Sequence, residues 1–166
     1  MRFLMVTAFV GLMSLPPAAP ARAEGGHPHG AHGHGAASGP AAPYAGLETR
    51  PIKALSDRQV ADLRAGRGMG YALAAELNGY PGPLHVLEHA DALGLDPFQR
   101  ARTESLFNAM KAQAVALGER LIGQEAELDR LFATRTIDAA ALDRATAAIA
   151  ATEGALRAVH LRHHLA

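Results

Sequence analysis

The sequence contains no cysteine and no tryptophan, and aromatic residues make up only 5% of its 166 residues. Without cysteine, neither disulfide bonds nor thiolate ligands are available, which an oxidising compartment permits but does not require. Valine and isoleucine are sparse and no stretch alternates apolar and polar residues, so β-strands are not expected. Much of the 49% apolar content is alanine, a strong helix former with little apolar area. These absences predict an all-α protein with a thin core.

Long hydrophobic runs are also lacking, apart from one at the N-terminus. Arg2 precedes an apolar run over residues 3–13, and Ala21 and Ala23 are small residues at the two positions that a signal peptidase reads. The run is shorter than the stretch of about 20 apolar residues that a membrane-spanning helix needs. We therefore interpret residues 1–23 as a cleaved signal peptide and expect a periplasmic protein without stable membrane insertion.

The chain has no excess of positive charge. Loss of Arg2 and Arg22 with the signal peptide reduces 16 Lys+Arg to 14, against 16 Asp+Glu, so the net charge becomes −2. Nucleic-acid recognition needs a basic surface, so this balance argues against a nucleic-acid partner. Enzyme signatures are missing as well, because no serine stands in a nucleophile elbow and the glycine-rich segment 66–70 follows no expected strand. We therefore expect no enzyme activity.

The composition after residue 23 predicts two parts. Residues 24–46 are rich in histidine, glycine and proline, which carry a high ordering entropy and little apolar surface, so we expect a disordered tail. From Leu47 onward Ala, Leu, Arg and Glu predominate, which predicts one helical domain over residues 47–166.

Two shorter helical segments are expected first in this domain. One covers residues 56–77 and is bent or broken by the glycines of residues 66–70. After a turn over residues 78–83, a short helix is expected over residues 84–93, and Gly94 ends it.

The longest expected helix has the clearest start. Asp96 can cap it, Pro97 suits the first helical position, and Gln99 completes a capping box, so we expect a helix from there to about Ala133. A connection over residues 134–138 leads to a last helix that continues towards the C-terminus. Two long helices joined by a tight link predict an antiparallel hairpin.

Both long helices carry a narrow apolar seam at steps of three and four residues. The seam consists of Leu106, Met110, Gln113, Leu117, Leu121, Gln124, Leu128 and Leu131 on the longest helix, and of Leu142, Ala145, Ile149, Thr152, Leu156, Val159 and His163 on the last. A two-layer hairpin of this composition leaves one apolar face uncovered. We expect a second copy of the chain, a client protein, or both to cover it, with a homodimer as the simpler arrangement.

The nine histidines fall into three clusters, the first of which lies in the expected tail. It consists of His27, His29, His32 and His34. A flexible histidine tract captures zinc, nickel or copper weakly, or else is an incidental linker.

The second cluster is His85, Glu88 and His89. The spacing i, i+3, i+4 places these side chains on one helix face, where they offer two imidazoles and a carboxylate to one metal, or else form a solvated face. The order differs from the HExxH of metalloproteases, so no protease is expected.

The third cluster, His160, His163 and His164, repeats that spacing near the C-terminus. It complements the helix dipole, or it forms a ligand set that His85 and His89 complete across the hairpin or across a dimer. Zinc is the leading candidate for the bound ion, with nickel, cobalt or copper as alternatives.

Two five-residue motifs stand at the heads of expected helices: residues 55–59 read LSDRQ and residues 95–99 read LDPFQ. With the histidine-rich tail and the helical, cysteine-free chain, they resemble the L-T-x-x-Q motif of the Spy/CpxP family of periplasmic proteins and its metal-linked ZraP- and CnrX-like relatives, with Ser or Asp in place of Thr. The resemblance implies antiparallel helical dimers that hold unfolded proteins on a concave surface. In metal-linked members it implies zinc, nickel or cobalt bound by histidine and glutamate.

Two functions of different classes follow. The first is an envelope-stress accessory protein, an ATP-independent, dimeric holdase that shields unfolded periplasmic proteins and that metal modulates. The alternative is a periplasmic heavy-metal sensor or buffer. A helical adaptor for an inner-membrane sensor or regulator is a third possibility.

Overall fold

A computed structural model describes residues 44–166, so the expected signal peptide 1–23, the four tail histidines and most of the expected tail lie outside the described residues. Residues 44–166 contain helices and turns and no strand, as the sequence predicted. The helices are α1 (Asp57–Arg64), α2 (Leu73–Glu76), α3 (Pro83–Glu88), α4 (Pro97–Ala133) and α5 (Ala139–His163).

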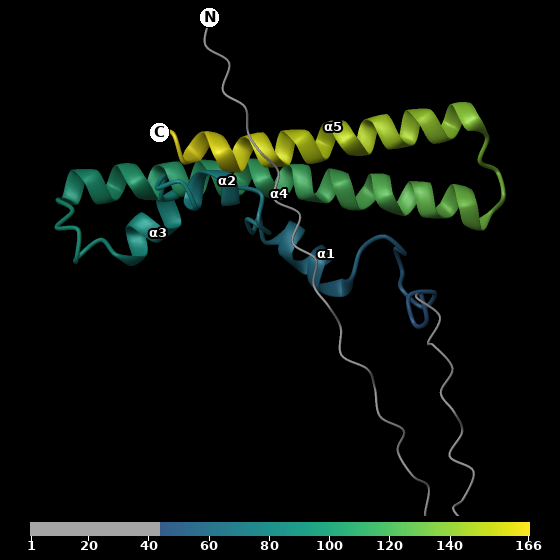
Figure 1. Cartoon of the computed structure of the whole chain (residues 1–166), viewed down its shortest axis with the longest axis horizontal. Helices are drawn as coiled ribbons and strands as arrows, with labels where there is room; N and C mark the ends of the chain where they lie inside the picture. The colour runs from purple at the N-terminus through teal and green to yellow at the C-terminus, as the bar shows by residue number, and fades with distance from the viewer. Residues whose placement is uncertain (1–43) are drawn as a thin grey trace, which may run out of the picture. The chain divides into compact units, whose positions relative to one another are not determined.

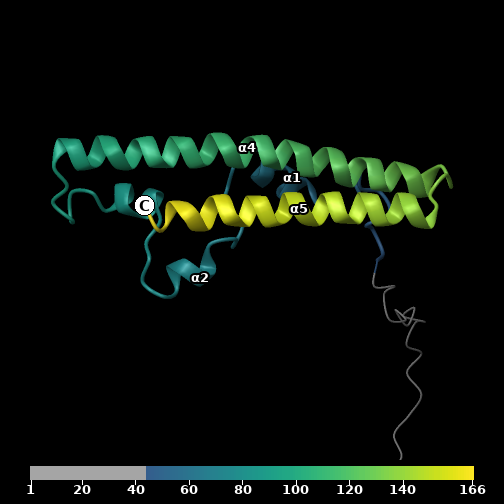
Figure 2. The ribbon, with the colours of Figure 1, turned by 90° about the horizontal axis from the view of Figure 1, so that it is seen from above.

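The predicted hairpin is formed by α4 and α5, which run side by side in opposite directions in both views (Figures 1 and 2). The predicted capping box begins α4: the Asp96 carboxylate accepts from the Gln99 backbone N–H at 2.8 Å, and the Gln99 side chain accepts from the Asp96 N–H at 3.0 Å. Asp138 caps α5 by accepting from the Ala141 N–H at 2.7 Å. Local side chains therefore define the starts of both long helices.

The buried face of α4 is wider than the predicted seam. Ala114 and Gly118 are buried although they lie off that seam, and the predicted seam residue Gln113 is exposed. The reason is α1, which packs on α4 beside α5. A Cβ atom at Gly118 would lie only 2.5 Å from the Leu63 carbonyl oxygen, so glycine lets the α1 backbone approach α4 closely.

The predicted seam of α5 is confirmed from Ile149 to Val159. Ile149, Thr152, Leu156, Val159 and His160 are its buried residues. The predicted seam residue His163 is only half-buried, and His160, which was not assigned to the seam, is the buried histidine.

The region before α4 differs from the expected two helices. The glycines of residues 66–70 break the first one into α1 and α2, and Gly66 and Gly70 both adopt positive φ. The next helix, α3, ends at Glu88 rather than near residue 93, since residues 89–94 form turns that Gly94 closes at φ 65°. α3 packs on the first part of α4 (Figure 1). Arg100 of α4 donates to Asp91 of these turns at 2.6 Å.

Large apolar side chains remain exposed around α2 and α3. They are Leu73, Leu77, Tyr80, Leu84 and Leu93, with exposed fractions from 44% to 80%. No helix in residues 44–166 is both long and apolar enough to cross a membrane.

Candidate functional site

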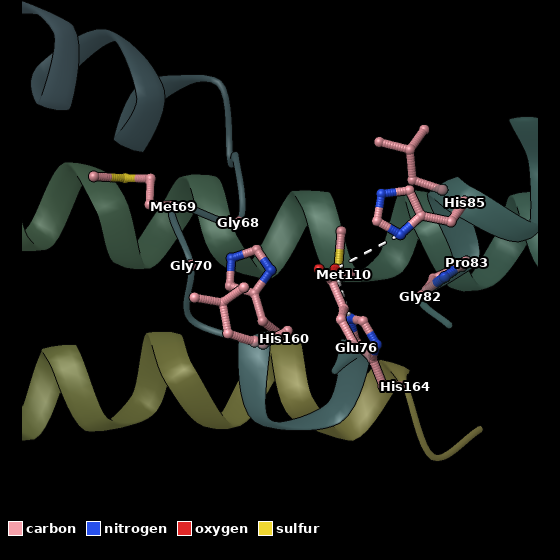
Figure 3. Close-up of a pocket in the computed structure, with 13 residues that line it drawn as sticks. Gly68, Met69, Gly70, Glu76, Gly82, Pro83, His85, Met110, His160 and His164 are labelled. Carbon is pink, nitrogen blue, oxygen red and sulfur yellow. Dashed lines mark ion pairs between the residues drawn. The ribbon is translucent and has the colours of Figure 1, made fainter. Parts of the chain in front are cut away.

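A hollow of about 290 Å³ lies where the loop before α2, α2 itself and the start of α3 meet α4 and the end of α5. Figure 3 shows the polar and sulfur-containing side chains that line it. Glu76 comes from α2, His85 from α3, Met110 from α4, His160 from α5, and His164 from the C-cap of α5. Elements far apart in the sequence therefore contribute donors to one hollow.

The Glu76 carboxylate lies between two imidazoles. Its Oε1 atom is 3.7 Å from His85 Nδ1 and 3.8 Å from His164 Nε2. Two donors bound to one tetrahedral ion at about 2.0–2.2 Å lie roughly 3.4 Å apart. Both observed separations therefore exceed that spacing by only a few tenths of an ångström.

His164 is held with one ring nitrogen directed at Glu76. Its Nδ1 lies 2.7 Å from the Tyr80 carbonyl oxygen. A carbonyl only accepts hydrogen bonds, so Nδ1 carries the proton and donates it, and in the neutral ring Nε2 presents a lone pair. Metal-binding histidines usually make this kind of bond through their other nitrogen. The side chain is only 5% exposed.

The backbone at Gly82 provides the space for the His164 ring. A Cβ atom there would lie 2.7 Å from both Cε1 and Nε2 of His164. Glycine at this position is therefore a steric requirement for the observed ring position.

His160 is buried in the same hollow and is 3% exposed. Its ring stacks on Tyr71 with centroids 5.8 Å apart, and its Nε2 atom is buried without a hydrogen-bond partner among residues 44–166. Burial lowers the pKa of His160, and the nearby His164 and His163 lower it further. The neutral ring is therefore favoured, which is the form that binds metals.

Tyr71 is the aromatic residue that stacks on the His160 ring. Burial raises the pKa of Tyr71, and the negative charge of Glu153 raises it further, so the phenol stays neutral. The stacked pair fixes the plane of the His160 imidazole.

The donor atoms of the hollow are not arranged around one common ion position. Among residues 44–166, no three carboxylate, imidazole or thiolate groups stand close enough together to hold an ion as they are. The side chains of His85 and Glu76 are 50% and 34% exposed, so they are less confined than those of His160 and His164, which are buried. The hollow thus combines two fixed imidazoles with two adjustable donors.

The structure brings together members of two predicted clusters and separates others. His85 lines the hollow together with His160 and His164, whereas the predicted set across the hairpin also included His89 and His163. Glu88 and His89 are exposed and do not line it. His163 lines a neighbouring hollow, and its Nδ1 donates to the Val159 carbonyl at 2.8 Å.

Glu76 is the donor that the sequence reasoning missed. It is the single acidic residue between Asp62 and Glu88. A lone carboxylate in a long stretch without other acidic residues, close before the histidine of α3, was an available signal. Glu76 and His85 are nine residues apart, which matches no helical period, so periodicity does not link the two residues.

Comparisons with protein-family models, with curated proteins and with solved structures give no match to this chain. The resemblance to the Spy/CpxP family therefore stays a prediction that rests on the sequence features given above.

Proposed function

We propose that this chain is a metal-binding buffer or sensor protein that takes a transition-metal ion in the hollow of Glu76, His85, His160 and His164. The observation that carries the proposal is the arrangement at Glu76. His164 Nδ1 donates to the Tyr80 carbonyl, and its other ring nitrogen, Nε2, lies 3.8 Å from the Glu76 carboxylate oxygen. A second proton or a shared cation is needed to make that arrangement favourable.

The donor set supports a transition metal over calcium or magnesium. Three imidazoles and one carboxylate suit zinc, nickel, cobalt and copper, whereas calcium and magnesium take oxygen ligands almost exclusively. The unpartnered Nε2 of His160 adds a buried donor that a bound ion would satisfy. Partial exposure of His85 leaves a route for the ion to enter.

The test is a titration of zinc, nickel and copper into the purified chain with its four tail histidines replaced by alanine, so that the tail contributes nothing. We expect an affinity better than about 0.1 mM, and weakening by about tenfold or more in His85→Ala and in His164→Ala.

His89→Ala is the matched variant for this experiment. It removes the same side chain from the end of the same helix, but His89 is exposed and does not line the hollow. The structure predicts little change in affinity, whereas the helix-face set of His85, Glu88 and His89 predicts as large a loss as His85→Ala. Absence of any binding better than about 0.1 mM would end the metal proposal.

A second candidate function is the ATP-independent holdase, and one observation favours it. Large apolar side chains are exposed on the segment that carries α2 and α3, with Leu77 80% and Leu73 50% exposed. Exposed apolar groups of this size mark surfaces that bind other proteins. We propose unfolded periplasmic proteins as the clients, in keeping with the resemblance to the Spy/CpxP family.

The holdase is tested by light scattering of an aggregating client with and without the chain. We expect suppression at stoichiometric amounts, and weaker suppression by Leu77→Ser. Leu77 is highly exposed, so its replacement leaves the core unchanged. Unchanged aggregation in the presence of the wild-type chain would rule the holdase out.

We also propose export to the periplasm after cleavage behind Ala23, and a homodimer in solution. N-terminal sequencing of the chain from a periplasmic extract tests the first, and Glu24 is the expected first residue. Light scattering after size exclusion tests the second, with and without zinc.

A further inference from the structure

The methionines of this chain have an uneven distribution. Three of the five, Met1, Met5 and Met13, precede residue 14, and the other two, Met69 and Met110, both line the hollow that holds the imidazoles. The chain has no cysteine, so thioethers are its only sulfur donors. Every sulfur atom in residues 44–166 therefore belongs to a side chain of this one site.

Met110 supplies a buried thioether. It projects from α4 and is 8% exposed, while it lines the hollow together with Glu76 and His160. In the view of Figure 3 its side chain lies between the rings of His160 and His85. A leucine would fill this position equally well as a core residue, since leucine and methionine are close in volume.

Met69 occupies an unusual backbone position at the rim. Its φ is +46°, a conformation that residues with a side chain seldom adopt. Glycines flank it on both sides. The side chain is 39% exposed, so burial in the core does not account for the strain. Strain of this kind persists mainly at functional sites. In Figure 3 the Met69 side chain points away from His160, so it would reach an ion only after rotating about its flexible bonds.

From these observations we propose that the hollow selects copper(I), with the Met110 thioether and the imidazoles of His160 and His164 as ligands and Met69 as a second thioether from the rim. The proposal rests on the proposed metal-binding function and specifies its ion. Thioethers are soft donors that favour copper(I), whereas zinc prefers nitrogen, thiolate and carboxylate ligands.

Two overlapping donor sets follow from the geometry. A divalent ion uses the harder set, in which Glu76 lies within 3.8 Å of His85 and His164. Copper(I) uses the softer set of Met110, His160 and His164, and gains little from a carboxylate. The two ions therefore respond to different substitutions, although they compete for one hollow.

The experiment measures copper(I) affinity by competition with a chromophoric copper(I) chelator, without oxygen and with ascorbate present. Zinc affinity is measured in parallel with a chromophoric zinc chelator. Both use the purified chain with its four tail histidines replaced by alanine. We expect Met110→Leu to weaken copper(I) binding by about tenfold or more and to change zinc binding by less than about twofold.

Glu76→Gln is the matched reciprocal variant, and we expect it to weaken zinc binding much more than copper(I) binding. X-ray absorption at the copper edge provides a second readout, because it detects sulfur neighbours of the ion. We expect Met110→Leu to reduce the sulfur contribution and the double variant Met110→Leu/Met69→Leu to abolish it.

Three outcomes overturn the copper(I) proposal while metal binding stands. They are equal loss of both ions in Met110→Leu, no loss of copper(I) in that variant, and no sulfur neighbour in the wild-type spectrum. If neither ion depends on His85 or His164, the proposed function fails as well. Circular dichroism of each variant tests whether misfolding causes the loss. We expect the leucine variants to fold, because leucine and methionine are close in volume.

Discussion

Two glycines of α4 are expected to respond differently to alanine. Gly118→Ala would place a Cβ atom 2.5 Å from the Leu63 carbonyl oxygen and 2.9 Å from its carbonyl carbon. Leu63 is 2% exposed and belongs to the core, so α1 must shift away from α4 to relieve the overlap. Overpacking of this kind destabilises by about 1–3 kcal/mol.

Gly123→Ala is the control, because it lies in the same helix and a Cβ atom there meets nothing within 4 Å. Both substitutions gain the same helix propensity, about 0.8–1.0 kcal/mol. That gain cancels when the two variants are compared, so their difference reports the contact with α1 alone. We expect Gly123→Ala to be more stable than Gly118→Ala by about 1–3 kcal/mol.

Urea unfolding followed by circular dichroism measures both free energies under one set of conditions. Gly123→Ala should unfold at a higher urea concentration than wild type, and Gly118→Ala at a lower one than Gly123→Ala. Equal stabilisation by both would mean that α1 does not pack against Gly118, and the packing of the α1–α4 face described above would then be incorrect.

Other substitutions test the core, the site and the charges. Leu156→Ala removes a core side chain that is 2% exposed and should cost about 2–5 kcal/mol in urea unfolding; a loss well below that range would contradict its burial. Gly82→Ala would displace the His164 ring, which lies 2.7 Å from the new Cβ, so metal affinity in the chelator assay should fall with every ligand still present. Burial and the charge of Glu153 raise the pKa of Glu125. The folded state therefore favours the protonated Glu125 carboxyl. The stability linked to this proton is fully present below the unfolded pKa and is lost as pH rises through the folded pKa. Glu125→Gln should therefore be more stable than wild type near neutral pH, and that advantage should vanish in acid.

Most of the helical architecture could be predicted because its signals are local. The capping residues Asp96 and Gln99 and the following proline define the start of α4, and they form the expected hydrogen bonds. The glycines of residues 66–70 broke the first expected helix. The end of α3 could not be read in this way. Residues 89–93 contain good helix formers, so no local signal stops the helix before Gly94, whereas the structure ends it at Glu88.

The site was predicted in part. The two clusters predicted from histidine spacing include His85, His160 and His164, which line the hollow, and also Glu88, His89 and His163, which do not. The spacing could not select His160 over His163, because both lie within one helical turn of the same face. The choice depends on Tyr71, which stacks on His160 from a different part of the chain.

By itself, the sequence determined that residues 44–166 form helices and where the long helices begin. These properties depend on composition and on neighbours within a few residues. Only the tertiary structure decided that Glu76, His85, Met110 and His164 surround one hollow. Their separations in the chain have no common period, so only the folding of the segment before α4 onto the end of the hairpin brings them together.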